Sequence, residues 1–98
     1  MLSNFHTYNL SVQLYKMGKN IIMNANLKNQ FERAASSVVL NVAEGSGRKT
    51  VADRNRFFSI ALGSLCEIQA ILDLLDIDGD ILLVADRLGA CLWKLCNK

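Results

Sequence analysis

The chain has 98 residues, of which 51% are hydrophobic and none is proline, and its net charge is +2. This length supports one domain, residues 1–98, and the apolar composition excludes an intrinsically disordered chain. A single histidine and three scattered cysteines lack the spacing of a zinc site, so we expect no metal and no cofactor. No apolar run reaches about 18 residues and the N-terminus does not resemble a secretory signal, which predicts a cytoplasmic protein without a membrane partner.

Charge is unevenly distributed along the chain. Residues 1–60 hold eight basic and three acidic residues, whereas residues 61–98 hold three basic and six acidic residues. The basic part could present a surface for phosphates, or it could be ordinary solvated charge.

The first two predicted helices span residues 4–23 and 27–45. In the first, Phe5, Tyr8 and Val12 recur at helical spacing and form one apolar face. The second is apolar on more than one side and keeps only one narrow polar stripe, so we expect another subunit to cover part of it. That stripe consists of Arg33, Ser37, Asn41, Glu44 and Arg48.

The third predicted helix begins at Thr50, where Thr50 and Asp53 form a pattern typical of a helix N-terminus. Gly63 and Ser64 lie in its middle. Glycine there costs about 1 kcal/mol against alanine, so we expect a neighbouring helix to approach closely at this position. The fourth helix covers residues 81–96. Short polar links predict an all-α, antiparallel up-down-up-down four-helix bundle.

Two glycine-containing motifs suggest ligand sites but fit turns better. NVAEGSGRKT, residues 41–50, has neither the preceding strand nor the glycine spacing of a phosphate loop. We expect Gly45 or Gly47 to end the second helix in the left-handed conformation. DIDGD, residues 76–80, begins like a calcium loop, but its glycine comes too early and the required glutamate is missing.

Asn41 and Glu44 are polar residues on a helix whose other faces are apolar. A buried carboxylate is costly unless it is paired, so we expect arginines to surround Glu44. The sequence therefore predicts a polar network that either sets helix register or binds a phosphate or carboxylate ligand. Its members are Arg33, Asn41, Glu44, Arg48, Arg56 and Glu67.

The stretch FERAASSVVLNVAEGSGRKTVADRNRFFSIALGSLCEIQAIL resembles a bacterial four-helix bundle family associated with 23S ribosomal RNA intervening sequences. The shared pattern is RAA-S, an asparagine, AEG-x-GR, RF and A-x-GS-x-E. It falls on Arg33, Ala34, Ala35, Ser37, Asn41, Ala43, Glu44, Gly45, Gly47, Arg48, Arg56, Phe57, Ala61, Gly63, Ser64 and Glu67. The resemblance implies an antiparallel bundle that assembles into a ring-like homo-oligomer, a pentamer. Relatives include accessory proteins of diversity-generating retroelements, which engage nucleic acid and a reverse transcriptase.

Two functions remain open, and neither is enzymatic. The sequence shows no nucleophile with a base and no ligand cluster, so we expect no catalytic residues and no enzyme. The first hypothesis is an oligomeric RNA- or DNA-binding module that contacts phosphates without reading sequence. Its contact candidates are Lys16, Lys19, Lys28, Arg48, Lys49 and Arg54. The alternative is a protein-interaction or scaffold subunit that uses apolar surface, including Leu40 and Trp93.

Overall fold

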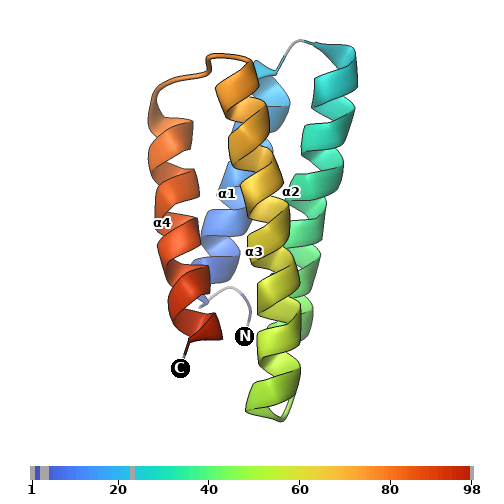
Figure 1. The fold of residues 1–98 in the computed structure, drawn as a ribbon, viewed down its shortest axis with the longest axis vertical. Helices are drawn as coiled ribbons and strands as arrows, with labels where there is room; N and C mark the ends of the chain where they lie inside the picture. Colours follow the sequence, from blue (N-terminus) through green and yellow to red (C-terminus); the bar gives the residue numbers. More distant parts are fainter. Residues whose placement is uncertain (1, 3–4, 23, 98) are drawn as a thin grey trace.

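The computed structural model describes residues 2, 5–22 and 24–97, and every regular element within them is a helix. The helices are α1 (His6–Ile21), α2 (Ala25–Ser46), α3 (Val51–Leu74) and α4 (Asp80–Cys96) (Figure 1). The four predicted helices are therefore confirmed, and every helix end given by the sequence prediction lies within two residues of the observed one.

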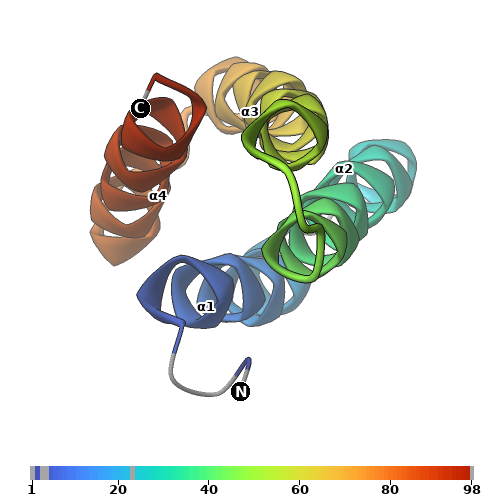
Figure 2. The same cartoon turned by 90° about the horizontal axis from the view of Figure 1, so that it is seen from below.

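The helices run antiparallel around one central core, which confirms the predicted fold class. Seen along the bundle axis, they follow one another around the core, and α1 closes the circle beside α4 (Figure 2). Each helix turns one apolar face inward, as its 3.6-residue periodicity predicts. The largest fully buried side chains of this core are Phe31, Leu14, Ile22, Leu65, Ile68, Leu72, Ile81, Leu88 and Leu92.

Two of the helices begin at side-chain caps. The Asn24 side chain accepts a hydrogen bond from the backbone N–H of Leu27 at 2.9 Å, and Thr50 accepts one from the N–H of Asp53 at 3.1 Å. The cap predicted at Thr50 is confirmed. The left-handed glycine predicted after α2 is wrong, because Gly47 ends that helix with φ −91° and ψ −4°.

The seam between α2 and α3 is built from small side chains. Ser37 and Ser64 bridge it through their hydroxyl groups, whose oxygens lie 2.9 Å apart. Two side chains as short as serine can meet only where the backbones are close. Near the end of the seam, a Cβ added to Gly45 would lie 2.7 Å from Cε1 of Phe58. Gly45 is therefore required for close packing, not for an unusual backbone conformation.

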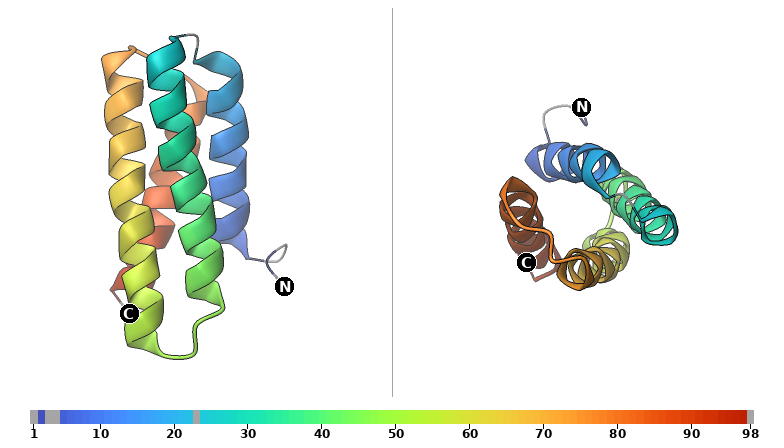
Figure 3. Two further views of the ribbon diagram at one scale, coloured as in Figure 1. Left: turned by 90° about the vertical axis from the view of Figure 1, so that its right-hand side faces the viewer. Right: turned by 90° about the horizontal axis from the view of Figure 1, so that it is seen from above.

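The hairpin formed by α2 and α3 extends beyond the other two helices. Helices α2 and α3 contain 22 and 24 residues, whereas α1 and α4 contain 16 and 17. At about 1.5 Å per residue, this difference corresponds to roughly 9 Å. Both side views show the α2–α3 turn protruding past the ends of α1 and α4 (Figures 1 and 3). We call residues 44–57 the hairpin tip.

Helix α3 is long and apolar enough to cross a membrane by length and composition alone, contrary to the expectation from apolar runs. The most apolar window in Val51–Leu74 has a mean hydropathy of 1.5, and 33% of it is buried inside the bundle. The expectation considered only uninterrupted apolar runs. Two charged residues interrupt this 18-residue window, but the mean hydropathy of the window remains high. A core helix of a bundle has the same composition, and α3 supplies Phe58, Ala61 and Leu65 to the core.

Replacing Gly45 with alanine should destabilise the bundle, and replacing Gly47 should not. The new methyl group at residue 45 would overlap the Phe58 ring, whereas at residue 47 it would meet only the Glu44 carbonyl oxygen at 3.7 Å. We expect Gly45→Ala to lower the free energy of unfolding by about 1–3 kcal/mol and Gly47→Ala to change it by less than about 0.5 kcal/mol. Urea denaturation measures both values, and equal effects would contradict the seam contact.

Candidate nucleic-acid interface

The hairpin tip concentrates positive charge at one end of the molecule. It carries four basic and two acidic residues, a net charge of +2 over 14 residues. The basic residues of the tip are Arg48, Lys49, Arg54 and Arg56. The opposite end is acidic, because four aspartates lie in and beside the turn between α3 and α4. They are Asp73, Asp76, Asp78 and Asp80.

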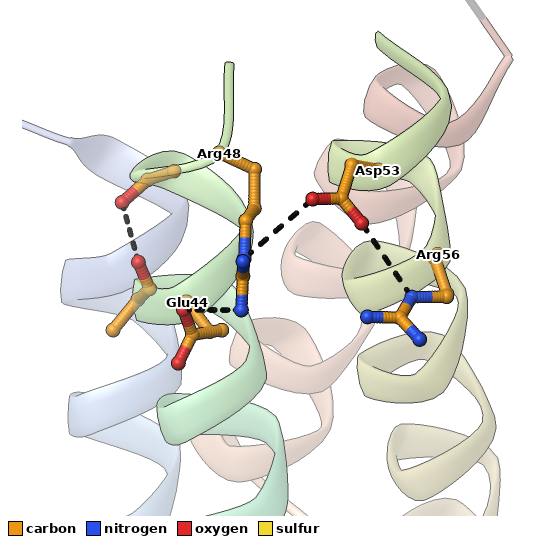
Figure 4. A network of polar contacts seen from close by, with 6 residues as sticks. Glu44, Arg48, Asp53 and Arg56 are labelled. Carbon is orange, nitrogen blue, oxygen red and sulfur yellow. Dashed lines mark hydrogen bonds and ion pairs between the residues drawn. The ribbon is translucent and has the colours of Figure 1, made fainter. Parts of the chain in front are cut away.

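A chain of ion pairs joins the two helices at the tip. Arg48 follows α2 and places Nη2 3.0 Å from Oε2 of Glu44. Its Nε lies 3.7 Å from Oδ2 of Asp53 on α3, and Oδ1 of Asp53 lies 3.6 Å from Nε of Arg56 (Figure 4). The Arg48 Nε is buried without a hydrogen bond, since 3.7 Å is too long for one. Arg48 therefore connects α2 to α3 mainly by charge.

Both of these arginines also contact an aromatic ring. The guanidinium carbons of Arg48 and Arg56 each lie 4.7 Å from the centroid of the Phe57 ring. A cation over an aromatic face contributes about 0.5–1 kcal/mol at exposed sites. These contacts hold both guanidinium groups at fixed places on the tip.

Lys49 and Arg54 are the basic side chains of the tip that take no part in these ion pairs among the described residues. Lys49 is exposed in the turn. Arg54 lies one helical turn into α3 and lines a cavity of about 530 Å³ at the same end of the bundle. Both charges are therefore available to an anionic partner.

The remaining members of the predicted polar network lie elsewhere. Asn41 donates to the carbonyl oxygen of Ser37 at 2.8 Å and to its hydroxyl oxygen at 3.2 Å. Arg33 and Glu67 line a separate groove of about 440 Å³ between α2 and α3. Within the described residues, neither forms an ion pair.

Two details of the predicted network are wrong. Glu44 is not buried, since 53% of its side chain is exposed. Arg56 and Glu67 share a face of α3, but eleven residues separate them by about 16 Å along the axis. The sequence spacing placed Arg56 and Glu67 on the correct face of α3, but it did not take their separation along the helix axis into account. Asp53 is a further member that the sequence pattern did not predict, although it follows Arg48 closely and carries the opposite charge.

The predicted nucleic-acid contacts divide into two groups. Arg48, Lys49 and Arg54 gather at the hairpin tip. Lys16 and Lys19 lie on α1, and Lys28 lies in the first turn of α2. Twenty residues of helix and turn between Lys28 and Arg48 correspond to about 30 Å. The six candidates therefore do not form one continuous surface.

Gly63 differs from its expected surroundings, whereas Trp93 lies on the surface, as the scaffold alternative expects. A Cβ added to Gly63 meets no described atom within 4 Å, so no helix of the same chain approaches it. Trp93 is 60% exposed and is not a core residue. Ser64, the neighbour of Gly63, does pack as expected, against Ser37. Among the described residues, no group of three or more His, Cys, Asp or Glu side chains could hold a metal ion.

The family model for the 23S rRNA-intervening sequence protein matches residues 5–80, more than three quarters of the chain. This chain belongs to that family. No curated protein and no solved structure matches it. The match begins just before α1 and ends at the first residue of α4, so the family pattern covers the first three helices and the three connections between consecutive helices.

The motif residues of this 23S rRNA-intervening sequence family member have identifiable physical roles. Ser37, Asn41 and Gly45 lie along the α2 side of the seam, and Ala61 and Ser64 lie along the α3 side. Helix packing accounts for these positions without a ligand. The motif residues Glu44, Arg48 and Arg56 belong to the hairpin tip instead, where they are partly exposed.

Removing either acidic side chain of the tip should have a small effect, larger for Asp53 than for Glu44. Asp53 pairs with two arginines and lies at the positive end of the α3 dipole, whereas Glu44 lies unfavourably near the C-terminus of α2. We expect Asp53→Ala to lower the free energy of unfolding by about 1 kcal/mol and Glu44→Ala by less than about 0.5 kcal/mol. Chemical denaturation at low and high salt measures both. A loss of several kcal/mol for Glu44→Ala would mean that its carboxylate is buried in the native protein.

Proposed function

We propose that this protein is a non-catalytic, cytoplasmic accessory module that binds RNA or DNA through the hairpin tip. The observation that carries the proposal is the separation of charge along the bundle. The tip has a net charge of +2 and protrudes beyond α1 and α4, whereas residues 73–80 at the opposite end carry four aspartates and no basic residue. Such a molecule approaches a polyanion with its tip first.

The arrangement of the tip suits contact with a phosphate backbone. Arg48 and Arg56 are held in place by ion pairs and by the Phe57 ring, and both side chains remain partly exposed. Lys49 and Arg54 add two further charges beside them. Contacts of this kind give affinity that depends on salt and carries little sequence information.

Reversing the two available charges should weaken binding. We expect Lys49→Glu with Arg54→Glu to reduce the affinity for labelled single-stranded RNA at least tenfold, and to lower the slope of log affinity against log salt by about 2. Fluorescence anisotropy from low to physiological salt measures both quantities.

The matched control is Lys16→Glu with Lys19→Glu, which makes the same change in net charge on α1. It should have a clearly smaller effect than the tip variant. Equal losses for the two double variants would show that net charge alone drives binding. Absence of binding by the unaltered protein at low salt would exclude the proposed function, and a protein partner such as a reverse transcriptase would become the next candidate.

Exposed apolar surface supports self-association, which also underlies the alternative function as a scaffold subunit. Leu74 is 73% exposed, Leu40 is 67% exposed and Ile60 on α3 is 48% exposed. Gly63 and Ala70 share the outer face of α3 with Ile60 and Leu74, at spacings of three, seven and four residues. We propose that a second copy covers this face, and a pentamer is the assembly that the family resemblance implies.

A bulky side chain at Gly63 should disrupt that assembly without harming the single bundle. In the isolated chain the new side chain meets no described atom, and leucine has a higher helix propensity than glycine. We expect Gly63→Leu to lower the molecular mass measured by light scattering. Gln13→Leu adds an apolar side chain on exposed α1 and should leave the mass unchanged. An unaltered mass for Gly63→Leu would remove the outer face of α3 from the interface.

A further inference from the structure

A cavity lies where the hairpin tip overhangs the ends of α1 and α4. Its volume is about 530 Å³, within the range of about 300–1,000 Å³ that small-molecule pockets occupy. One wall comes from Phe5, just before α1, and from Leu95 near the end of α4. The other wall comes from the tip and the start of α3. The cavity exists because α2 and α3 are longer than their neighbours.

Its lining combines two aromatic rings with three polar side chains. Phe58 is buried and forms the inner wall, and the Phe5 ring lies 6.5 Å from it between centroids, tilted by 57°. Ser46, Arg54 and Asn55 supply a hydroxyl, a guanidinium and a carboxamide. Of these groups, the Ser46 hydroxyl donates to the carbonyl oxygen of Ala43 at 2.7 Å, and its lone pairs stay available.

This set of groups matches the parts of a nucleotide. Aromatic rings stack against the planar face of a base, and carboxamide and hydroxyl groups hydrogen-bond to its edge. A guanidinium pairs with phosphate, often in bidentate fashion. A simple inorganic anion would leave the aromatic wall unused. A long acyl chain would need an enclosed apolar channel, whereas this cavity presents polar groups on one side.

We propose that the cavity receives one unpaired base of a single-stranded nucleic acid, with Arg54 on the adjoining phosphate. The inference rests on the proposed function and adds a ligand class to it, because it selects unpaired nucleotides over duplex. Lys49 and Arg48 lie on the same tip and take the phosphates that follow along the strand. Base stacking then adds affinity that the phosphate contacts alone do not provide.

The test compares an intact single-stranded oligonucleotide with an abasic strand of equal length and charge. We expect the intact strand to bind about tenfold more tightly, as one stacked base allows. Ser46→Phe, which fills the cavity without changing charge, should remove this difference while affinity for the abasic strand persists. Asn55→Leu, a second uncharged change in the lining, should reduce the difference as well.

The matched control is Ser36→Phe. Ser36 also lies on α2, and its hydroxyl donates to the carbonyl oxygen three residues earlier, at 3.1 Å, as that of Ser46 does. This variant should keep the preference for the intact strand. Circular dichroism melting of each variant verifies that the bundle is folded.

The outcomes separate the two proposals. Equal affinity for intact and abasic strands in the unaltered protein would overturn the base-binding cavity and leave the phosphate-binding tip in place. A preference for the intact strand that persists in folded Ser46→Phe and Asn55→Leu would also overturn the cavity, because the base would then bind elsewhere. Failure of both strands to bind at low salt would overturn the proposed function and the cavity together.

Discussion

The close approach of α2 and α3 is the constraint on which the rest of this structure depends. Serine hydroxyl oxygens 2.9 Å apart and a glycine against the Phe58 ring leave no room for larger side chains along the seam. Because these two helices are tightly paired, they can continue as a hairpin after α1 and α4 have ended. The protruding tip and the cavity beneath it are both consequences of that pairing.

The distribution of charge also makes the two ends of the bundle different. The tip is held together across the turn by Arg48, which pairs with Glu44 on α2 and Asp53 on α3 and lies over the Phe57 ring. Partly exposed ion pairs contribute little stability, so this cluster matters more for placing guanidinium groups than for folding. With Asp73, Asp76, Asp78 and Asp80 gathered at the other end, the bundle has one positive end instead of a uniformly basic surface.

A chain of 98 residues has a thin core, and this one leaves large apolar side chains on its surface. Leu40, Leu74 and Trp93 are each more than half exposed. Exposed apolar surface on this scale is typical of interfaces. On the outer face of α3, Gly63 has no side chain and nothing of the same chain close to it, which leaves room for the proposed partner. The proposed self-association and the proposed tip-first binding would involve different faces, so the two proposals are compatible in one assembly.

The sequence by itself determined the four helices, the cap at Thr50 and the inward faces, because local periodicity and hydrogen-bonding chemistry set all of these. Its motif residues also identified the family. Only the tertiary structure decided which polar residues meet. Periodicity placed Arg56 and Glu67 on one face but did not give their separation along the helix axis. The pattern at the end of the second helix predicted a left-handed Gly45 or Gly47, whereas Gly45 serves close packing and Gly47 ends α2 with a negative φ. Nothing in the sequence pairs Gly18 with Phe31, whose ring occupies the space of the missing side chain. The cavity was equally unpredictable, since it arises from unequal helix lengths and from residues far apart in the chain that meet only in the folded bundle.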